Sequence, residues 1–345
     1  MAKAGKDMGS DLGTANTLIY TKDDGIVLNE ASVIAYDNRN QAIIATGSKA
    51  KDMIGKAPEN IVVVRPLQEG VISDFDMTAE MLQRFIKTAL NDRKPTGMSV
   101  VVGVPSGVTE VEKIAVEEVV RQMGAREVFI IDEPTAAAIG AGMDIDGAEA
   151  CMIADFGGGT VDIAILALGG IVVSTSLRYA GDQFDEAIIQ YVRKKKGVLI
   201  GNKTAEMLKM SVGCALVEND SSGKEIIESV EARGRDLISG LPRTLKVTNR
   251  DMEAALHESM ETIIEAIKNT VEKAPPEVAA DIAEKGMMLS GGGANLHNLD
   301  KLIELRTGLK VTIAEQPYEA VAIGAGKSLE NIDKLRLYAD DKKRR

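Results

Sequence analysis

The chain reads Asp155-Phe-Gly-Gly-Gly-Thr-Val-Asp-Ile163 near its middle and Asp11-Leu-Gly-Thr-Ala-Asn-Thr-Leu-Ile19 near its start. In both stretches a candidate strand start is followed by Asp, an apolar residue and Gly. The apolar pattern then resumes. Their spacing is about the length of one domain. Two similar α/β halves, each presenting an Asp-Gly turn, would place a ligand between them. Because the similar stretches are short, the alternative is that their similarity arose by chance.

The two glycine turns offer backbone N–H groups to an anion. A hairpin turn containing Gly13 can point successive N–H groups inward, and a glycine admits a phosphate where a Cβ would block it. Gly157, Gly158 and Gly159 offer the same on the other half. Either turn alone is more often just a tight turn. The pairing of the two favours a phosphate site.

Asp11 and Asp155 stand at the strand ends that lead into these turns. Two carboxylates facing a triphosphate would hold Mg2+ through waters that the ion retains. The alternative is that each aspartate caps its own turn. We favour the metal role because both aspartates occur at the same offset from a glycine.

Two further segments are candidates for contacts with a nucleoside. Ser290-Gly-Gly-Gly-Ala294 follows the strand-like Gly286 to Leu289, and its bare backbone would lie against a flat base or ribose. The helix-forming Thr204-Ala-Glu-Met-Leu-Lys209 would present Glu206 and Lys209 on one face for ribose and base contacts. A flexible loop and an ordinary solvated ion pair are the alternatives.

A third segment, Val128-Phe-Ile-Ile-Asp-Glu-Pro-Thr-Ala-Ala-Ala138, is typical of a buried strand turning into a helix with Pro134 at its first position. Glu133 then lies at the mouth of the helix. A carboxylate there is usually a dipole or capping partner. It is also well placed to orient a water for in-line attack on phosphorus, a role that is mainly positioning.

Strand and helix patterns alternate along the chain, which predicts an α/β architecture. Thr109 and Glu112 form a capping box for a helix that ends near Gly124, and apolar residues from Met252 to Val271 share one helical face. Short runs rich in Val and Ile suit strands buried on both faces of a sheet. These runs are Ile61 to Val64, Val100 to Val104, Val128 to Ile131, Met152 to Ala154 and Ile163 to Leu168.

Composition excludes several classes of function. With 345 residues, 45% of them apolar, two domains are expected. The net charge is −11, so we expect no nucleic-acid partner. Cys151 and Cys214 are too few for a disulfide framework or a zinc cluster. We expect a cytoplasmic protein, because no signal peptide precedes the first strand and no apolar run approaches about 18 residues.

The ordered set of motifs resembles the nucleotide site of the actin, heat-shock chaperone and sugar-kinase superfamily. The set is Asp11-Leu-Gly-Thr14, Glu133-Pro-Thr-Ala-Ala-Ala138, Asp155-Phe-Gly-Gly-Gly-Thr160 and Gly291-Gly-Gly293. Further stretches resemble the MreB family of bacterial cell-shape proteins, from about residue 9 to about residue 330. Among them are Gly25 to Glu30, Arg65-Pro-Leu67, Val104 to Glu112, Ala180-Gly-Asp182, Asp185 to Tyr191 and Leu199-Ile-Gly201.

The resemblance implies an actin-like fold of two similar α/β halves, each with a smaller inserted subdomain, and a nucleotide in the central cleft. The first half would comprise subdomain IA, residues 1–32, 74–145 and 318–345, and subdomain IB, residues 33–73. The second half would comprise subdomain IIA, residues 146–181 and 243–317, and subdomain IIB, residues 182–242.

The resemblance also implies roles for single residues. Glu133 and Thr160 would position the attacking water, and Asp11 and Asp155 would hold the waters of Mg2+. The ATP-binding residues would be Gly13, Thr14, Ala15, Asn16, Gly157, Gly158, Gly159, Thr160, Gly181, Glu206, Lys209, Met210, Gly291, Gly292 and Gly293. Four departures from the family pattern leave the choice between ATP and GTP open. Asp162 replaces a glutamate, Met210 and Ser211 replace residues that are usually charged, and Ser10 replaces an apolar residue before Asp11.

The implied activity is a slow ATPase coupled to polymerisation. ATP-bound subunits would add head to tail into filaments that organise cell shape at the inner face of the cytoplasmic membrane, with cell-shape membrane proteins as partners. A plasmid-partition filament, a sugar or acetate kinase and a chaperone-type ATPase are the alternatives. A kinase would need a second pocket, and a chaperone normally carries a separate peptide-binding domain.

The membrane attachment itself has little support in the sequence. Residues Met1 to Ser10 contain too few apolar side chains for an interfacial helix. The best insertion loop is Asn91 to Met98, in which Met98 is the single large apolar residue and Arg93 and Lys94 would meet anionic lipid. We therefore expect weak binding of the polymer, through Met98, and hardly any binding of the monomer.

Overall fold

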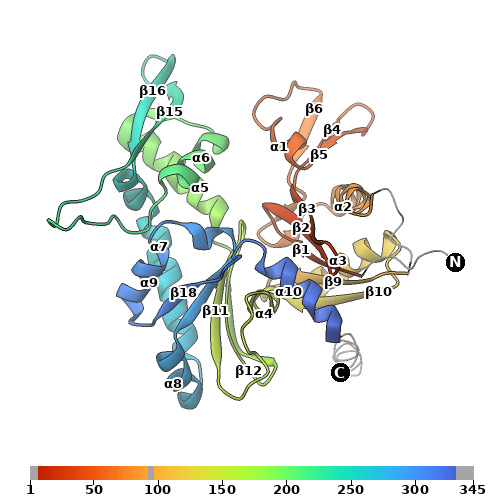
Figure 1. The fold of residues 1–345 in the computed structure, drawn as a ribbon. Coiled ribbons are helices and arrows are strands. Elements are labelled where there is room, and N and C mark those ends of the chain that lie inside the picture. The colour runs from red at the N-terminus through yellow and green to blue at the C-terminus, as the bar shows by residue number, and fades with distance from the viewer. Residues whose placement is uncertain (1–6, 92–96, 332–345) are drawn as a thin grey trace.

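The computed structural model describes residues 7–91 and 97–331. Two five-stranded sheets form the centre of the molecule, one in each half (Figure 1). The first sheet has the order β10-β9-β1-β2-β3, with β1 (Met8–Leu12), β2 (Asn16–Thr21), β3 (Gly25–Ala31), β9 (Ser99–Val104) and β10 (Glu127–Asp132). The second has the order β13-β12-β11-β17-β18, with β11 (Cys151–Phe156), β12 (Val161–Ala167), β13 (Gly170–Leu177), β17 (Met287–Ser290) and β18 (Val311–Ile313).

The two sheets repeat the same pairing pattern. Strand β1 is antiparallel to β2 and parallel to β9, and β11 is antiparallel to β12 and parallel to β17. Asp11 on β1 and Asp155 on β11 therefore occupy equivalent central strands. The short echo in the sequence marks a structural repeat, and the prediction of two similar α/β halves is confirmed.

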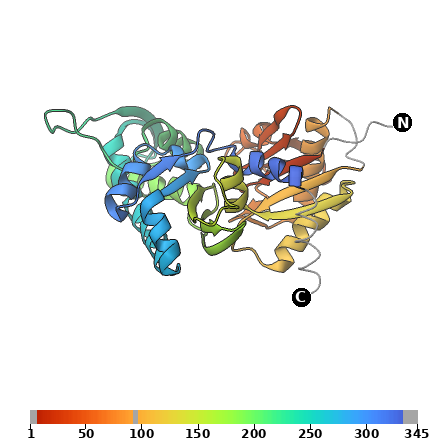
Figure 2. The same cartoon turned by 60° about the horizontal axis from the view of Figure 1, so that its bottom comes forward.

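Helices cover the sheets, and the two halves meet around two of these helices (Figure 2). The helices of the first half are α2 (Phe75–Ala89), α3 (Glu110–Gln122), α4 (Glu133–Gly140) and α10 (Ala320–Ser328). Those of the second half are α5 (Gly181–Tyr191), α6 (Asn202–Val212), α7 (Asn249–Glu272), α8 (Pro276–Lys285) and α9 (Leu299–Thr307). One apolar cluster joins α4 and α10 with residues of both sheets, among them Val101 and Ile153.

Helices α4 and α10 approach each other through glycines. A Cβ added to Gly324 would lie 1.7 Å from the carbonyl oxygen of Ala136, and one added to Gly140 would lie 1.9 Å from that of Ala320. Only glycine fits at such backbone contacts. This close crossing lets small residues build the joint between the two halves.

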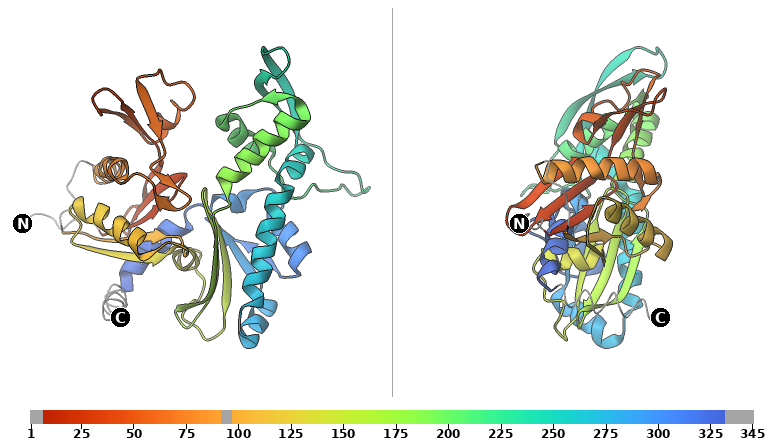
Figure 3. Two further views of the ribbon diagram at one scale, coloured as in Figure 1. Left: turned by 180° about the vertical axis from the view of Figure 1, so that it is seen from behind. Right: turned by 90° about the vertical axis from the view of Figure 1, so that its right-hand side faces the viewer.

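A smaller sheet lies on each half, and both stand at the same end of the molecule (Figure 3). The first has the order β5-β4-β6, with β4 (Ile34–Asp37), β5 (Ile43–Thr46), β6 (Ile61–Val64) and the short helix α1 (Ser48–Lys51). The second has the order β14-β15-β16, with β14 (Val198–Leu199), β15 (Ser229–Asp236) and β16 (Pro242–Thr248). The remaining elements are β7 (Leu67–Gln68), β8 (Val71–Ile72), a π-helical turn η1 (Val192–Lys196) and the 3-10 turns η2 (Gly292–Asn295) and η3 (Leu329–Asn331).

Local signals in the sequence set several boundaries. Glu112 N donates to Thr109 Oγ1 (3.3 Å) and Thr109 N donates to Glu112 Oε2 (2.6 Å), so α3 begins at the predicted capping box. Helix α4 begins at Glu133, one residue before the predicted position of Pro134.

The prediction that Ile61 to Val64 is buried on both faces is wrong. These residues are half-buried because β6 is an edge strand of a small sheet.

Met98 does not lie on the surface, so its predicted membrane contact is wrong. Its side chain is 0% exposed and packs in the apolar core of the first half, because the residue directly precedes the buried strand β9. Arg93 and Lys94 of the same loop lie outside the described residues, as do residues 1–6. Within residues 7–91 and 97–331, no helix has both the length and the apolar content needed to cross a bilayer.

Candidate functional site

A cavity of about 1320 Å3 lies between the two halves. Every residue predicted to bind nucleotide, metal or the attacking water lines this cavity, although they come from distant parts of the chain. Strand ends β1 and β11 contribute the aspartates, α4 contributes Glu133, α6 contributes Glu206, and the turn after β17 contributes Gly291. The repeat of the two halves brings these segments together, because equivalent strand ends face each other.

The two glycine turns meet face to face. A Cβ added to Gly158 would lie 2.5 Å from the Cβ of Ala15, so a larger residue would push the turns apart. The amino terminus of α5 abuts the second turn, where Asp182 N donates to the carbonyl oxygen of Gly158 (2.8 Å). The glycine turns and the positive end of an 11-residue helix therefore lie next to each other on the cavity. This arrangement suits an anionic phosphate.

Asp11 and Asp155 form a pair of carboxylates on this cavity. Burial raises the pKa of Asp11 to about 7, and the charge of Asp155 adds to the rise. Burial likewise raises the pKa of Asp155 to about 7, although Ser290 Oγ donates a hydrogen bond to Asp155 Oδ1 (2.7 Å). A cation bound beside the two carboxyls would stabilise them as anions and oppose these rises in pKa. The donor pair therefore fits a divalent ion that keeps its waters.

Glu133 is the first residue of α4 and is buried. Burial raises its pKa well above the usual value, and the charges of Asp11 and Asp162 act in the same direction. A carboxyl with a raised pKa is suited to accept a proton near neutral pH. Glu133 lines the same cavity as Asp11 and Asp155.

Asp162, one of the four departures noted in the sequence, connects the two halves. It is fully buried on β12, and its Oδ1 accepts a hydrogen bond from the backbone N of Ser106, which follows β9 in the other half (2.9 Å). The hydroxyls of Ser176 and Thr160 also lie beside the Asp162 carboxylate. Burial raises the pKa of Asp162. Sequence reasoning gave Asp162 no role, because its partner is distant in the chain.

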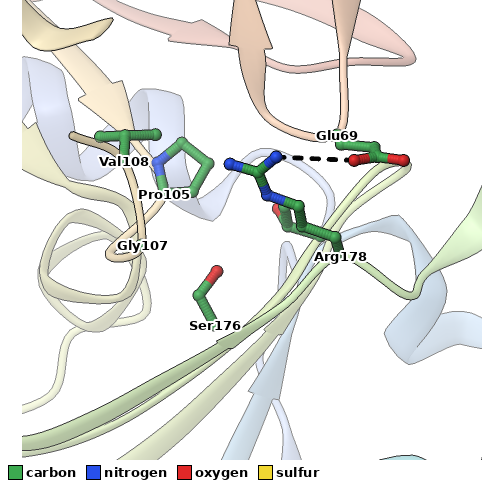
Figure 4. Close-up of a pocket in the computed structure, with 7 residues that line it drawn as sticks. Glu69, Pro105, Gly107, Val108, Ser176 and Arg178 are labelled. Carbon is green, nitrogen blue, oxygen red and sulfur yellow. Dashed lines mark ion pairs between the residues drawn. The ribbon is translucent and has the colours of Figure 1, made fainter. Parts of the chain in front are cut away.

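A second, smaller cavity of about 80 Å3 lies between the segment that follows β9 and the end of β13 (Figure 4). Pro105, Gly107, Val108 and Ser176 line it, and Arg178 spans its side, forming an ion pair with Glu69 (3.6 Å). Thr160 lines both cavities. The smaller cavity has both polar and apolar walls and has room for more than one water molecule.

Helices α5 and α6 and the third glycine cluster, Gly291 to Gly293, line another part of the large cavity. Lys209 Nζ donates to the carbonyl oxygen of Gly181 (2.8 Å) and pairs with Asp185 (2.9 Å), whereas Glu206 pairs with Lys51 (2.7 Å). The alternative of a solvated Glu206–Lys209 pair is therefore wrong, because each residue forms its ion pair elsewhere. Met210 is 80% exposed at the rim.

Sequence reasoning missed two features of this end. Three ion pairs join residues 51–65 of the first half to residues 182–206 of the second half across the cavity. They are Lys51–Glu206 (2.7 Å), Asp52–Lys203 (2.7 Å) and Arg65–Asp182 (2.8 Å). Tyr318 lies against Gly292, and its hydroxyl donates to Asn29 Oδ1 (2.9 Å). Burial raises the pKa of Tyr318 to about 12, so it stays a neutral donor. No local pattern signals such pairs, because their members are more than 100 residues apart.

Two repeated α/β halves, with a glycine hairpin of each facing one shared cavity, define an actin-like protein. The chain belongs to the MreB/Mbl family: the family model described as MreB/Mbl protein matches residues 5–337. Over 332 residues it is 47% identical to the cell shape-determining protein MreB of Escherichia coli (strain K12), a match that covers 95% of this chain and 94% of that protein.

Solved structures show the same fold. MreB5 of Spiroplasma citri bound to ADP has a TM-score of 0.90 at 36% identity, covering 96% of this chain and 98% of that one. The same protein bound to AMPPNP has a TM-score of 0.91 at 35% identity, with coverage of 98% and 99%. A chain of the MamK double helical filament has a TM-score of 0.78 at 21% identity, with coverage of 94% and 98%. These structures confirm the predicted actin-like fold.

Proposed function

We propose that this chain binds and hydrolyses ATP and polymerises into filaments that organise bacterial cell shape. The observation that carries the proposal is the convergence of both glycine hairpins, the aspartate pair and Glu133 on one cavity. The MreB5 structures, bound to ADP and to AMPPNP, support an adenine nucleotide as the ligand. The cell-shape role is supported by the name and the 47% identity of the E. coli relative.

In this proposal the phosphates lie between the turns at Gly13 and Gly158, against the amino terminus of α5. Asp11 and Asp155 hold Mg2+ through its waters, and the ion, when bound, neutralises charge on the phosphates. The ribose lies near Glu206, and the base lies between Met210 and the third glycine cluster, Gly291 to Gly293.

Hydrolysis then depends on the position of one water. Glu133 and Thr160 orient this water in line with the last phosphate, and Glu133 takes up its proton. The raised pKa of Glu133 suits this step, because burial makes its carboxylate a stronger base. The cross-cavity ion pairs hold the small lobes at residues 33–73 and 182–242 together. The closed cavity then keeps bulk water away from the site.

Three finer statements are part of the same proposal. The four subdomains have the boundaries given by the resemblance, with the small lobes at residues 33–73 and 182–242. The filament assembles head to tail from identical subunits. The protein works in the cytoplasm at the inner membrane surface, with cell-shape membrane proteins as partners.

Release of phosphate from Mg-ATP by the purified chain tests the proposed activity. Water is the only acceptor that the proposal requires, so phosphate should appear with neither a sugar nor acetate present. A kinase of the same fold would instead release ADP only when an acceptor hydroxyl or carboxylate is added. That result, or an absence of ATP binding by calorimetry, would contradict the proposal.

A further inference from the structure

A buried carboxylate, Asp162, lies close to the proposed hydrolytic residues and takes no part in the steps described above. It is 0% exposed on β12. Asp162 comes two residues after Thr160, and side chains two apart along an extended chain point to the same face. In the sheet it lies opposite Asp155 of β11 and Ser176 of β13. A charged group is rarely buried without partners, so its surroundings indicate its use.

Three donors, drawn from both halves, surround this carboxylate. Ser106 N, which follows β9 in the first half, donates to Asp162 Oδ1 (2.9 Å). The hydroxyls of Ser176 and Thr160 lie beside the same carboxylate. Burial raises the pKa of Asp162, whereas Ser106 N and the two hydroxyls act in the opposite direction, as donors to an anion do. The carboxylate is therefore placed to accept from the hydroxyls as well as from Ser106 N.

The direction of the Thr160 hydroxyl matters for hydrolysis. A threonine hydroxyl can either donate or accept a hydrogen bond, whereas a carboxylate can only accept. A water that attacks phosphorus must turn a lone pair toward it and direct its protons at acceptors. Glu133 and Thr160 line the same cavity and can be these acceptors, provided that the proton of Thr160 points elsewhere. Asp162 offers an acceptor that turns this proton away from the water.

We infer that Asp162 is a positioning residue for hydrolysis, which accepts the proton of the Thr160 hydroxyl and so leaves Thr160 Oγ1 free to accept from the attacking water. Asp162 acts through Thr160 in this role and does not hold the nucleotide. Because Ser106 N of the first half binds the same carboxylate, the orientation of Thr160 in the second half depends on both halves. The inference rests on the proposed hydrolysis of ATP and adds the group that orients one of its two water-holding residues.

Single-turnover release of phosphate from Mg-ATP tests this role. Asp162→Asn keeps the size of the side chain and an acceptor for Ser106 N, but its amide can donate to Thr160, which frees the hydroxyl proton to turn toward the water. The rate should fall at least about tenfold, while ATP affinity by calorimetry stays within about threefold. Asp162→Glu retains a carboxylate and should keep the rate within about threefold of the parent. Equal slowing of the two variants would show that the carboxylate is not the feature that matters.

Asp251→Asn is the matched control. Asp251 is a buried aspartate of the same half (9% exposed) that closes the capping box of α7 and accepts from Thr248 N (3.0 Å). This variant should release phosphate like the parent, even though it perturbs a buried carboxylate of the second half. A general loss of stability is thereby distinguished from a loss of Thr160 orientation.

The same substitution in a Thr160→Val background decides whether Asp162 acts through Thr160. The valine removes the hydroxyl, so Asp162→Asn should then slow release by less than about twofold further, which two independent effects would not do. Equal slowing in both backgrounds would overturn the inference, and so would an Asp162→Asn variant that releases phosphate like the parent. Loss of ATP binding by Asp162→Asn would also overturn it and assign Asp162 to holding the two halves together. A parent chain that binds Mg-ATP and releases no phosphate would instead contradict the proposed function.

Discussion

Lys51 Nζ lies 2.7 Å from Glu206 Oε1 and joins helix α1 of the first half to helix α6 of the second. Both side chains are about one third exposed, as are those of the Arg65–Asp182 pair. Both Lys51 and Glu206 line the large cavity, so the pair spans it. We therefore regard the part-buried pairs as the contacts that keep the small lobes together.

The first prediction concerns nucleotide release. Lys51→Ala or Arg65→Ala should speed dissociation of bound ATP about fivefold, because a partly screened ion pair is worth about 1 kcal/mol. Lys203→Ala is the control, since the Lys203–Asp52 pair is mostly exposed and should contribute little. Stopped-flow measurement with a fluorescent ATP analogue gives the rates. Equal rates in all three variants would show that the pairs do not hold the cavity closed.

The second prediction concerns Glu133. Glu133→Ala should slow phosphate release about 100-fold or more while ATP affinity stays within a few-fold, because the group positions water and does not hold the nucleotide. Asp132→Ala is a matched control for the loss of a neighbouring carboxylate, since Asp132 instead faces Lys113 (3.9 Å). If the Glu133 variant turns over normally, the assignment of the catalytic group fails.

The third prediction concerns pH. The pKa values of Asp11 and Asp155 are raised to about 7 in the folded chain, against about 4 when unfolded. Between these values the folded state holds protons that the unfolded state has released, so stability without ligand falls as pH rises through this window. From pH 6 to pH 8 the loss should be about 1 kcal/mol per group.

Thermal or urea unfolding at the two pH values measures this loss. Asp155→Asn should flatten the pH dependence and weaken the binding of Mg-ATP, because it removes one ionisable partner of the metal. Saturating Mg-ATP should reverse the trend in the parent, since metal binding favours the ionised carboxylates. A parent whose stability without ligand increases from pH 6 to pH 8 would contradict this account.

Much of the fold and site could be predicted from the sequence, because local signals carried them. The Asp-Gly turns at Asp11 and Asp155 marked the repeat, and the capping box at Thr109 marked the start of α3. The cross-cavity ion pairs could not be predicted, because Lys51 and Glu206 are 155 residues apart and neither position has a local signature. Only the fold brings them together.

For Met98 a local pattern was present, but it led to a wrong prediction. In the sequence it is a lone apolar residue after a polar loop, which is also the pattern expected of an exposed loop tip. Strand β9 pairs with β1 and β10, and this pairing places Met98, the residue directly before β9, in the apolar core of the first half. The burial of Met98 depends on this tertiary contact, about which the loop sequence from Asn91 to Met98 carries no information.

The fourth prediction follows from that burial. Met98→Ser should lower the free energy of unfolding by about 2–5 kcal/mol, because it removes a packed side chain and buries a hydroxyl. Met210→Ser is the control, as Met210 is 80% exposed and its loss should change stability by less than about 0.5 kcal/mol. Urea unfolding measures both variants. A Met98 variant that is as stable as the parent but binds vesicles less well would restore the membrane role of this residue.

Electron microscopy of the purified chain with and without Mg-ATP tests the central claim most directly. We predict filaments with Mg-ATP above a critical concentration, and monomers when nucleotide is omitted. Monomers at every concentration with Mg-ATP bound, or filaments that form equally well without nucleotide, would contradict the account of an ATP-driven polymerising protein.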